Sequence, residues 1–181
     1  MPQMLARSLE FERMAAKSKV EVDLLRKLKD DERIAEMMPK AVSKQNRNQN
    51  LKPILLILGY LFQHDVVHHE AFAESLNLIR KLAPFEIQLM LETAQEIHAQ
   101  SMMGAMVKRL SAKTFETVVM FNQFMVQGMW KDADPLAQLP HFDTAMIKQY
   151  KKTLKNFSIK SGSILEFCKL TPAQRKELNL F

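Results

Sequence analysis

Apolar residues recur along most of this chain at intervals of three and four positions, which is the spacing of one face of an α-helix. The helices that this pattern predicts cover residues 4–15, 21–38, 51–63, 69–82, 85–110, 111–131, 143–155 and 163–169. No stretch alternates between apolar and polar residues for long enough to predict a strand. We therefore expect an all-α fold.

The connections between the predicted helices differ in kind. Pro84 fits the first turn of a helix, where its missing N–H costs nothing, so a new helix is expected to begin there. Residues 39–50 are polar and rich in asparagine, which predicts an irregular connection. Proline disfavours the α region for the residue before it, so Leu139-Pro140 ends the series of longer helices. We predict a helical bundle over residues 1–138.

The residues after this stop predict a smaller module of short helices. Ser163 is followed by Glu166 three positions later, and Thr171 is followed by Gln174. Both pairs match the capping box, in which the two side chains satisfy backbone N–H groups at the start of a helix. Two short helices joined by a tight turn form a hairpin. Residues 139–181 are therefore predicted to be a helical-hairpin module.

The composition agrees with a folded helical protein. Apolar residues make up 47% of the 181 residues, and only 4 glycines and 7 prolines are present. The abundant unbranched side chains lose little rotamer freedom in helices. The 13 methionines would suit an adaptable binding groove, but methionine also fills irregular gaps between packed helices. We favour the core role for them.

The cysteine content bears on the redox compartment of the protein, and the length of its apolar runs bears on whether a segment could cross a membrane. The single cysteine, Cys168, lies in an apolar stretch, so we expect it to be a small core residue. One cysteine allows no internal disulfide, which favours a reducing compartment. The longest apolar run, residues 53–62, is too short to cross a bilayer. The chain is therefore expected to be soluble as given.

Positive charge is concentrated near the C-terminus of the chain. Of the net charge of +6, residues 139–181 contribute eight Lys or Arg against three Asp or Glu. Lysines at helical spacing, with one more in the following loop, form a candidate polyanion contact: Lys148, Lys151, Lys152, Lys155 and Lys160. Such a strip can bind nucleic-acid phosphates or an anionic membrane. We favour a solvated helix face, because only Gly162 offers the glycine that phosphate-binding hairpins use.

Sequence patterns typical of enzymes are missing from the chain. It has no glycine-rich phosphate loop, no Gly-x-Ser-x-Gly and no His-Glu-x-x-His. His64 and His68 have a spacing that can share a metal ion, with Glu70 nearby, which leaves a metal-dependent enzyme as an alternative. A stable site needs further ligands, so we favour surface or capping histidines. His98 is expected to be a satisfied structural histidine. No cofactor and no catalytic residue are predicted.

One segment resembles a known family. Residues Leu136–Phe142, Leu-Ala-Gln-Leu-Pro-His-Phe, are similar to the Gln-Leu-Pro-His motif of the Brl (Sec sixty-three) domain. As in that family, a helix ending in Met125–Met129 precedes the motif, and a helix, a basic connection and Ile164–Phe167 follow it. Segments that resemble blocks nearer the family's N-terminus are Ser8–Phe11, Glu21–Leu25 and Ile54–Leu61. The resemblance covers nearly the whole chain.

The residues of this motif predict a junction between the bundle and the hairpin module. Leu139 and Pro140 would fix an abrupt change of chain direction. Phe142 would anchor the hairpin on the bundle, and His141 would cap a helix or form a hydrogen bond across the joint. None of these roles requires catalysis.

The Brl domain occurs in two settings. One is a translocation subunit of the endoplasmic reticulum (ER), which partners the protein-conducting channel, and the other is the C-terminal units of RNA and DNA helicases, including spliceosomal ones. The long, lysine-rich connection between Ile147 and Ile164 resembles the first branch, whereas Trp130 resembles the spliceosomal branch. The resemblance favours a scaffold that contacts translocon subunits on the cytosolic face of the ER membrane. The alternative is a helicase accessory unit whose basic hairpin contacts nucleic acid.

The chain also departs from complete members of both branches. It contains no His-Pro-Asp triplet of a J domain, no transmembrane helix and no helicase ATP-binding motif. It stops before the fibronectin-type-III-like sandwich that usually completes the domain. We therefore expect it to be a fragment of a larger protein.

Overall fold

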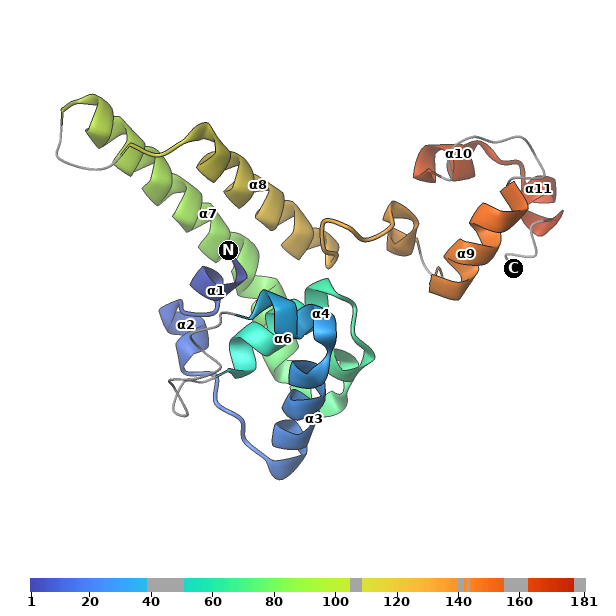
Figure 1. Ribbon diagram of the computed structural model, residues 1–181, viewed down its shortest axis with the longest axis horizontal. Coiled ribbons are helices and arrows are strands. Elements are labelled where there is room, and N and C mark those ends of the chain that lie inside the picture. The colour runs from blue at the N-terminus through green and yellow to red at the C-terminus, as the bar shows by residue number, and fades with distance from the viewer. Residues whose placement is uncertain (39–50, 105–108, 140–141, 143, 155–162, 178–181) are drawn as a thin grey trace. The chain divides into compact units, whose positions relative to one another are not determined.

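The computed structural model describes residues 1–38, 51–104, 109–139, 142, 144–154 and 163–177 (Figure 1). All regular structure within these ranges is helical, which confirms the predicted all-α fold. The chain divides into two compact units, Met1–Lys131 and Asp132–Phe181. This division falls in the turn after the long helices, before the boundary predicted at 138/139.

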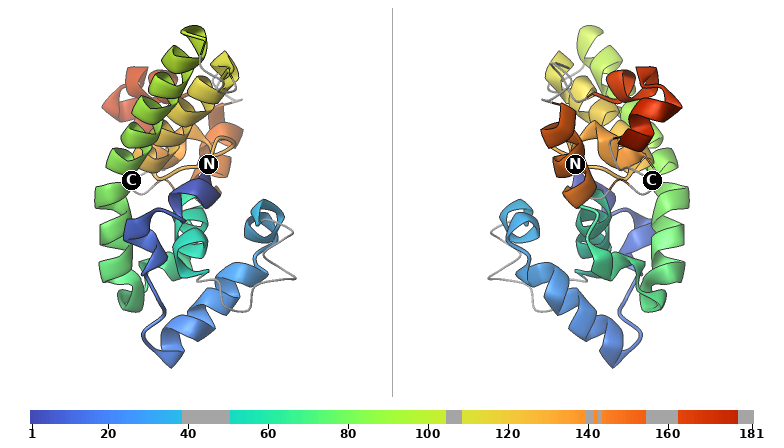
Figure 2. Two further views of the ribbon diagram at one scale, coloured as in Figure 1. Left: turned by 90° about the vertical axis from the view of Figure 1, so that its left-hand side faces the viewer. Right: turned by 90° about the vertical axis from the view of Figure 1, so that its right-hand side faces the viewer.

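Short helices surround one half of a long helical hairpin in the first unit. Its helices are α1 (Pro2–Leu5), α2 (Leu9–Glu12), α3 (Lys19–Asp30), α4 (Glu32–Met37), α6 (Lys52–Leu61), the 3₁₀ helices η1 (Asp65–His68) and η2 (Glu70–Phe72), α7 (Ala73–Met102) and α8 (Ala112–Gln127). In both views of Figure 2, α8 lies beside the C-terminal half of α7, α1 lies near the middle of α7, and α2 and α6 lie toward its N-terminal half.

Two helices predicted from the sequence are each divided in the structure. The segment 4–15 forms α1 and α2, and the segment 21–38 breaks between α3 and α4. At the second break Asp31 adopts an extended backbone, and its side chain accepts hydrogen bonds from the N–H groups of Arg33 and Ile34. Such a cap stabilises a new helix start, so the chain can turn while Ile34 stays in the core.

The two helices predicted at 69–82 and 85–110 are one continuous helix, α7, and Pro84 lies inside it. The start predicted at Pro84 is therefore wrong. A proline inside a helix removes one backbone hydrogen bond and costs about 3 kcal/mol. Here Ala83 and Ile87 on either side are buried in the core. Their burial holds the helical path through the proline.

Helix α6 is the centre of the first unit. Every residue of α6 except Tyr60 is buried, as its almost uninterrupted apolar sequence predicts. Gly59 lets this helix approach its neighbours closely, because a Cβ atom there would lie 2.5 Å from Val67 Cγ1 and 3.1 Å from Leu28 Cδ2. Only glycine fits that contact without displacing a buried side chain.

A buried ion pair lies at the start of α6. The Lys52 ammonium is 2.9 Å from Glu21 Oε2, and the two side chains are only 1% and 6% exposed. The same Glu21 oxygen accepts a 2.7 Å hydrogen bond from the Lys17 N–H, and Lys52 donates to the Ala15 carbonyl. Burial raises the pKa of Glu21, but these hydrogen bonds and the ammonium outweigh it and hold the pKa below its ordinary value.

The end of α8 is fixed to the end of α6. Gly128 closes α8 in the left-handed region, with φ of 65°, and a Cβ there would lie 2.8 Å from Tyr60 Oη. The Trp130 N–H donates a 2.8 Å hydrogen bond to the Leu61 carbonyl. The indole ring of Trp130 also packs on two aromatic rings of the bundle, so this residue has a structural role.

The second unit has short helices around an aromatic core. It contains η3 (Pro135–Gln138), α9 (Thr144–Leu154), α10 (Ile164–Lys169) and α11 (Pro172–Glu177). The capping box predicted at Thr171 is confirmed, because the Thr171 and Gln174 side chains accept from each other's N–H groups. At Ser163 one half of the predicted box is present: Ser163 Oγ accepts from the Glu166 N–H, whereas the buried Glu166 Oε2 has no hydrogen-bond partner among the described residues. The expectation for Cys168 is wrong, because α10 buries Phe167 and leaves the neighbouring cysteine exposed.

Replacing Gly59 by alanine is expected to destabilise the first unit. Overpacking a close core contact costs about 1–3 kcal/mol, which exceeds the gain of about 1 kcal/mol in helix propensity. Denaturant unfolding measures the change. Adding Val67→Ala makes room, so the double variant should lose less stability than the sum of the two single variants. Strict additivity would contradict the close contact.

Replacing one partner of the buried ion pair is expected to cost more than replacing both. Lys52→Met alone leaves the Glu21 carboxylate buried without its ammonium, at a cost of about 3–5 kcal/mol. Lys52→Met combined with Glu21→Leu should recover much of that loss. Urea unfolding of the wild type, Lys52→Met, Glu21→Leu and the double variant tests this expectation, and a double variant that loses as much stability as the two single variants together contradicts it.

The same pair predicts an acid limb in the stability curve. Because folding lowers the pKa of Glu21, its ionised form adds stability above its unfolded pKa. That stability is lost as the pH falls through the folded pKa. Glu21→Gln should flatten this limb, measured as the free energy of unfolding against pH. The exposed Asp23 on the same helix provides the control, and Asp23→Asn should keep the wild-type slope.

Candidate functional site

The predicted junction residues that the structure describes belong to the core of the second unit. Phe142 is 6% exposed, and its ring meets Phe167 and Tyr150 edge-to-face, with centroids 5.1 and 6.2 Å apart. Leu139 is half-buried and packs against the same core. Pro140 and His141 lie outside the described residues. The role of the motif as a joint to the bundle stays a prediction.

The lysines of the candidate polyanion contact lie on the outside of α9 as far as the structure describes them. Lys148, Lys151 and Lys152 are exposed, and Lys155 and Lys160 lie outside the described residues. The opposite face of α9 is buried in the core. The Lys151 ammonium pairs with the Asp134 carboxylate, which also caps η3. One of the three described lysines is therefore already engaged within the unit.

Of the two histidines considered as metal ligands, His64 caps a short helix and His68 is exposed at the end of η1, and the neighbouring His69 is a second cap. His64 Nδ1 accepts a 3.2 Å hydrogen bond from the Val66 N–H, which opens η1. His69 Nδ1 accepts a 3.1 Å bond from the Ala71 N–H, which opens η2. Both nitrogens are used by the backbone, as expected for capping residues. In the part of the chain that the structure describes, no three His, Cys, Asp or Glu side chains gather to hold a metal ion.

His98 also departs in part from its expected role. Its ring packs edge-to-face on Phe115, with centroids 5.6 Å apart, in the pair formed by α7 and α8. The expectation of a fully satisfied histidine is wrong, because its buried Nδ1 atom has no hydrogen-bond partner among the described residues.

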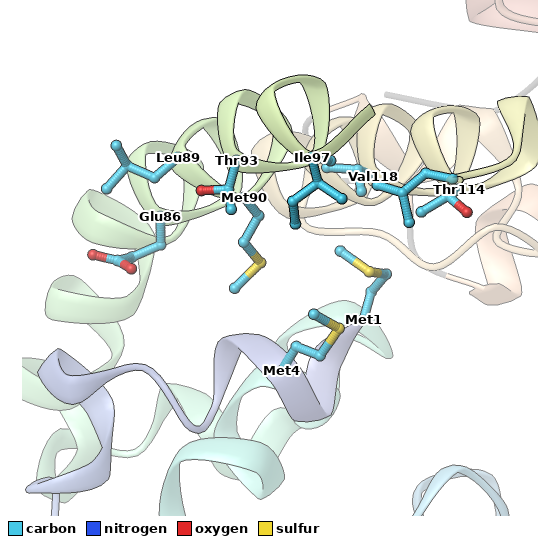
Figure 3. Close-up of a pocket in the computed structure, with 11 residues that line it drawn as sticks. Met1, Met4, Glu86, Leu89, Met90, Thr93, Ile97, Thr114 and Val118 are labelled. Atoms are coloured by element: carbon cyan, nitrogen blue, oxygen red, sulfur yellow. The ribbon is translucent and has the colours of Figure 1, made fainter. Parts of the chain in front are cut away.

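The first unit contains an apolar cavity that the sequence did not predict. It has a volume of about 380 Å³ and lies between α1, α7 and α8 (Figure 3). Met1 and Met4 on α1 face Met90 and Ile97 on α7. The hydroxyl-bearing Thr93 also lines it, as does Thr114 on α8. Three methionines thus line a binding-sized cavity, whereas Met125 and Met129 are core residues as expected.

A carboxyl group marks one end of the cavity. Glu86 on α7 lines it, and Glu10 on α2 lies close enough to interact. Partial burial raises the pKa of Glu86, and the neighbouring negative charge and hydrogen bonding of Glu10 raise it further. The two acidic groups form no ion pair with a described Lys or Arg.

The chain matches no protein-family model, no curated protein and no solved structure.

No helix in the described ranges is long and apolar enough to cross a membrane. The cavity of the first unit is a concave apolar surface with a carboxyl group at its edge. The only sequence signal for it was the methionine content, together with Met1 and Met4 at helical spacing.

Replacing Phe142 by alanine is expected to loosen the second unit alone. Removing a buried phenylalanine side chain costs about 3–5 kcal/mol, and Tyr150 and Phe167 lose their edge-to-face partner. Hydrogen exchange should become faster in α9 and α10 and stay unchanged in α6. Leu165→Ala, at an exposed position of α10, is the matched control. Equal protection in the two variants would contradict the assigned role of Phe142.

Proposed function

We propose that this chain is a non-catalytic scaffold of the Brl type, acting in protein translocation on the cytosolic face of the ER membrane. The observation that carries the proposal is the packing of Phe142, the last residue of the Leu-Pro-His motif segment, between α9 and α10. It joins the motif to the helices that follow it. This arrangement supports the resemblance at its most specific segment.

The order of the elements also supports the proposal. A long helix, α8, ends at Gly128 and is followed by η3, the motif, α9 and the capped pair α10 and α11. The resemblance implies that succession of a bundle helix, a Leu-Pro-His joint, a helix and a hairpin. His64, which was considered as a metal ligand, serves as a helix cap here. Its use in capping favours a structural role over catalysis.

The alternative is an accessory Brl unit of a spliceosomal-type RNA helicase. Lys148 and Lys152 are exposed on α9 and form no described ion pair, which favours some contact with phosphate. Lys151 is engaged by Asp134, which reduces the free charge of the strip. Trp130, the residue that resembles this branch, is explained by its packing on Phe62 and Phe124. The translocation branch is therefore our first proposal.

Affinity purification separates the two branches. The tagged intact gene product is purified from detergent-solubilised ER membranes and, in parallel, from nuclear extract. We expect subunits of the protein-conducting channel in the membrane eluate, because a translocon scaffold binds them. Channel subunits absent from that eluate, with spliceosomal particles in the nuclear one, would overturn the translocation proposal.

Binding of single-stranded RNA tests the alternative directly. If α9 contacts phosphate, Lys148→Glu with Lys152→Glu should abolish a mobility shift at low salt. Lys27→Glu with Lys29→Glu, on the exposed face of α3, changes the net charge equally and is the control. Under the translocation proposal the wild-type chain gives no shift that depends on α9.

A further inference from the structure

We propose that the apolar cavity of the first unit is a groove that binds an amphipathic helix of a partner protein, with a basic end of that helix beside Glu86. The inference names a contact surface for the proposed scaffold, and in that respect it rests on the proposed function. All residues of this groove belong to the first unit.

The groove has the length that a helix requires. The residues of α7 that line it occupy positions 86, 89, 90, 93, 94 and 97, which repeat at helical spacing along one face. Positions 86 and 97 are separated by eleven helical rises of 1.5 Å, which gives a groove about 16 Å long, or about three turns. A partner helix presents its own apolar side chains at intervals of three and four residues. Two such faces match in length and in period.

The walls of the groove favour a helix over an extended peptide. Apart from Met1 and Leu110 they come from α1, α7 and α8, so most of their backbone groups lie within helices and offer no sheet edge. An extended peptide would find no sheet edge with which to pair its own backbone. A helix satisfies its own N–H and C=O groups and needs only apolar contact. Methionine side chains provide that contact adaptably, because they are flexible and polarisable.

Apolar side chains at the groove remain exposed to solvent. Met4 is 59% exposed and Leu89 is 42% exposed, and both line it. Phe85, one residue before Glu86, is 62% exposed. A single exposed apolar residue is ordinary, but a group beside a groove is typical of a surface that another molecule covers.

Charge identifies the kind of helix that fits. Glu86 is the only residue lining the groove that has a charged side chain, and Glu10 lies beside it. From Leu82 to Met102, α7 carries three glutamates and no Lys or Arg. Arg109 and Lys113 precede lining residues at the other end, so the acidic character is confined to the Glu86 end. A lysine or arginine at one end of the partner helix would neutralise the carboxyl pair there.

Peptide binding to the purified full chain tests the proposal. The probes are fluorescent peptides of about four turns, the length of the groove plus its ends, with leucine on one face and glutamine on the other. A lysine pair stands at the N-terminal end of one probe and at the C-terminal end of a second. Control peptides carry glutamate pairs at the same places. We expect anisotropy to show binding of at least one lysine probe, about tenfold tighter than its glutamate control.

Variants of the chain locate the binding. Thr93→Trp fills the groove from a solvent-exposed position and should abolish binding, whereas Gln95→Trp, exposed on another face of α7, should not. Glu86→Gln should lower the affinity for the lysine probe several-fold. It should also reduce the difference in affinity between the lysine probe and its glutamate control. Glu96→Gln removes an acidic group outside the groove and should have no effect. Circular dichroism verifies that all four variants keep the wild-type helix content.

Several results would overturn the proposal. One is the absence of binding by both lysine probes, and another is equal binding of lysine and glutamate peptides. Equal effects of Thr93→Trp and Gln95→Trp would place binding elsewhere. If the chain sediments as a dimer that Thr93→Trp dissociates, the occupant is a second copy. If phosphatidylserine vesicles displace the probe, and Thr93→Trp abolishes their binding too, the occupant of the groove is a membrane surface. Each of these results leaves the channel co-purification test unaffected.

Discussion

The first unit depends on the complete burial of α6 and on the charge that this burial encloses. Lys52 begins the helix, and the surrounding elements leave its ammonium no access to water. A buried cation is tolerated only beside an anion and hydrogen-bond acceptors. Glu21 and the Ala15 carbonyl fill that need, and the Ser18 side chain caps α3 so that Glu21 is held in its first turn. The ion pair therefore fixes where α3 meets α6.

The other end of α6 positions the long hairpin. The absence of a side chain at Gly59 brings Val67 and Leu28 onto the helix, and Gly128 lets the end of α8 meet Tyr60. The hydrogen bond from the Trp130 N–H to the Leu61 carbonyl closes the same end. Beyond the core, α7 and α8 continue as a pair of packed helices (Figure 1). The cavity lies where α1 meets that pair.

The sequence predicted the helices well, because apolar spacing depends on local geometry alone. It predicted the capping box at Thr171 and the Ser163 side-chain cap, since a cap is also local. It failed at Asp31 and Pro84, where core packing decided whether the helix stopped or continued. The cavity was not predicted, because an uncovered surface depends on which helix faces meet. The sequence alone does not distinguish Met4 and Met90, which line the cavity, from Met125, which is buried in the core.

The carboxyl pair beside the cavity contrasts with the treatment of acidic groups elsewhere in the described chain. Glu21 is paired with Lys52, and the Asp31 and Asp134 carboxylates both cap a helix and bind a cation. Glu86 instead lies next to another carboxyl group and next to exposed apolar side chains. Like charges held close together destabilise a fold, and so does apolar surface left in water. The repulsion between the carboxyl groups and the exposed apolar surface occur at the same end of the groove. A basic amphipathic helix would neutralise the carboxyl groups and cover the apolar side chains.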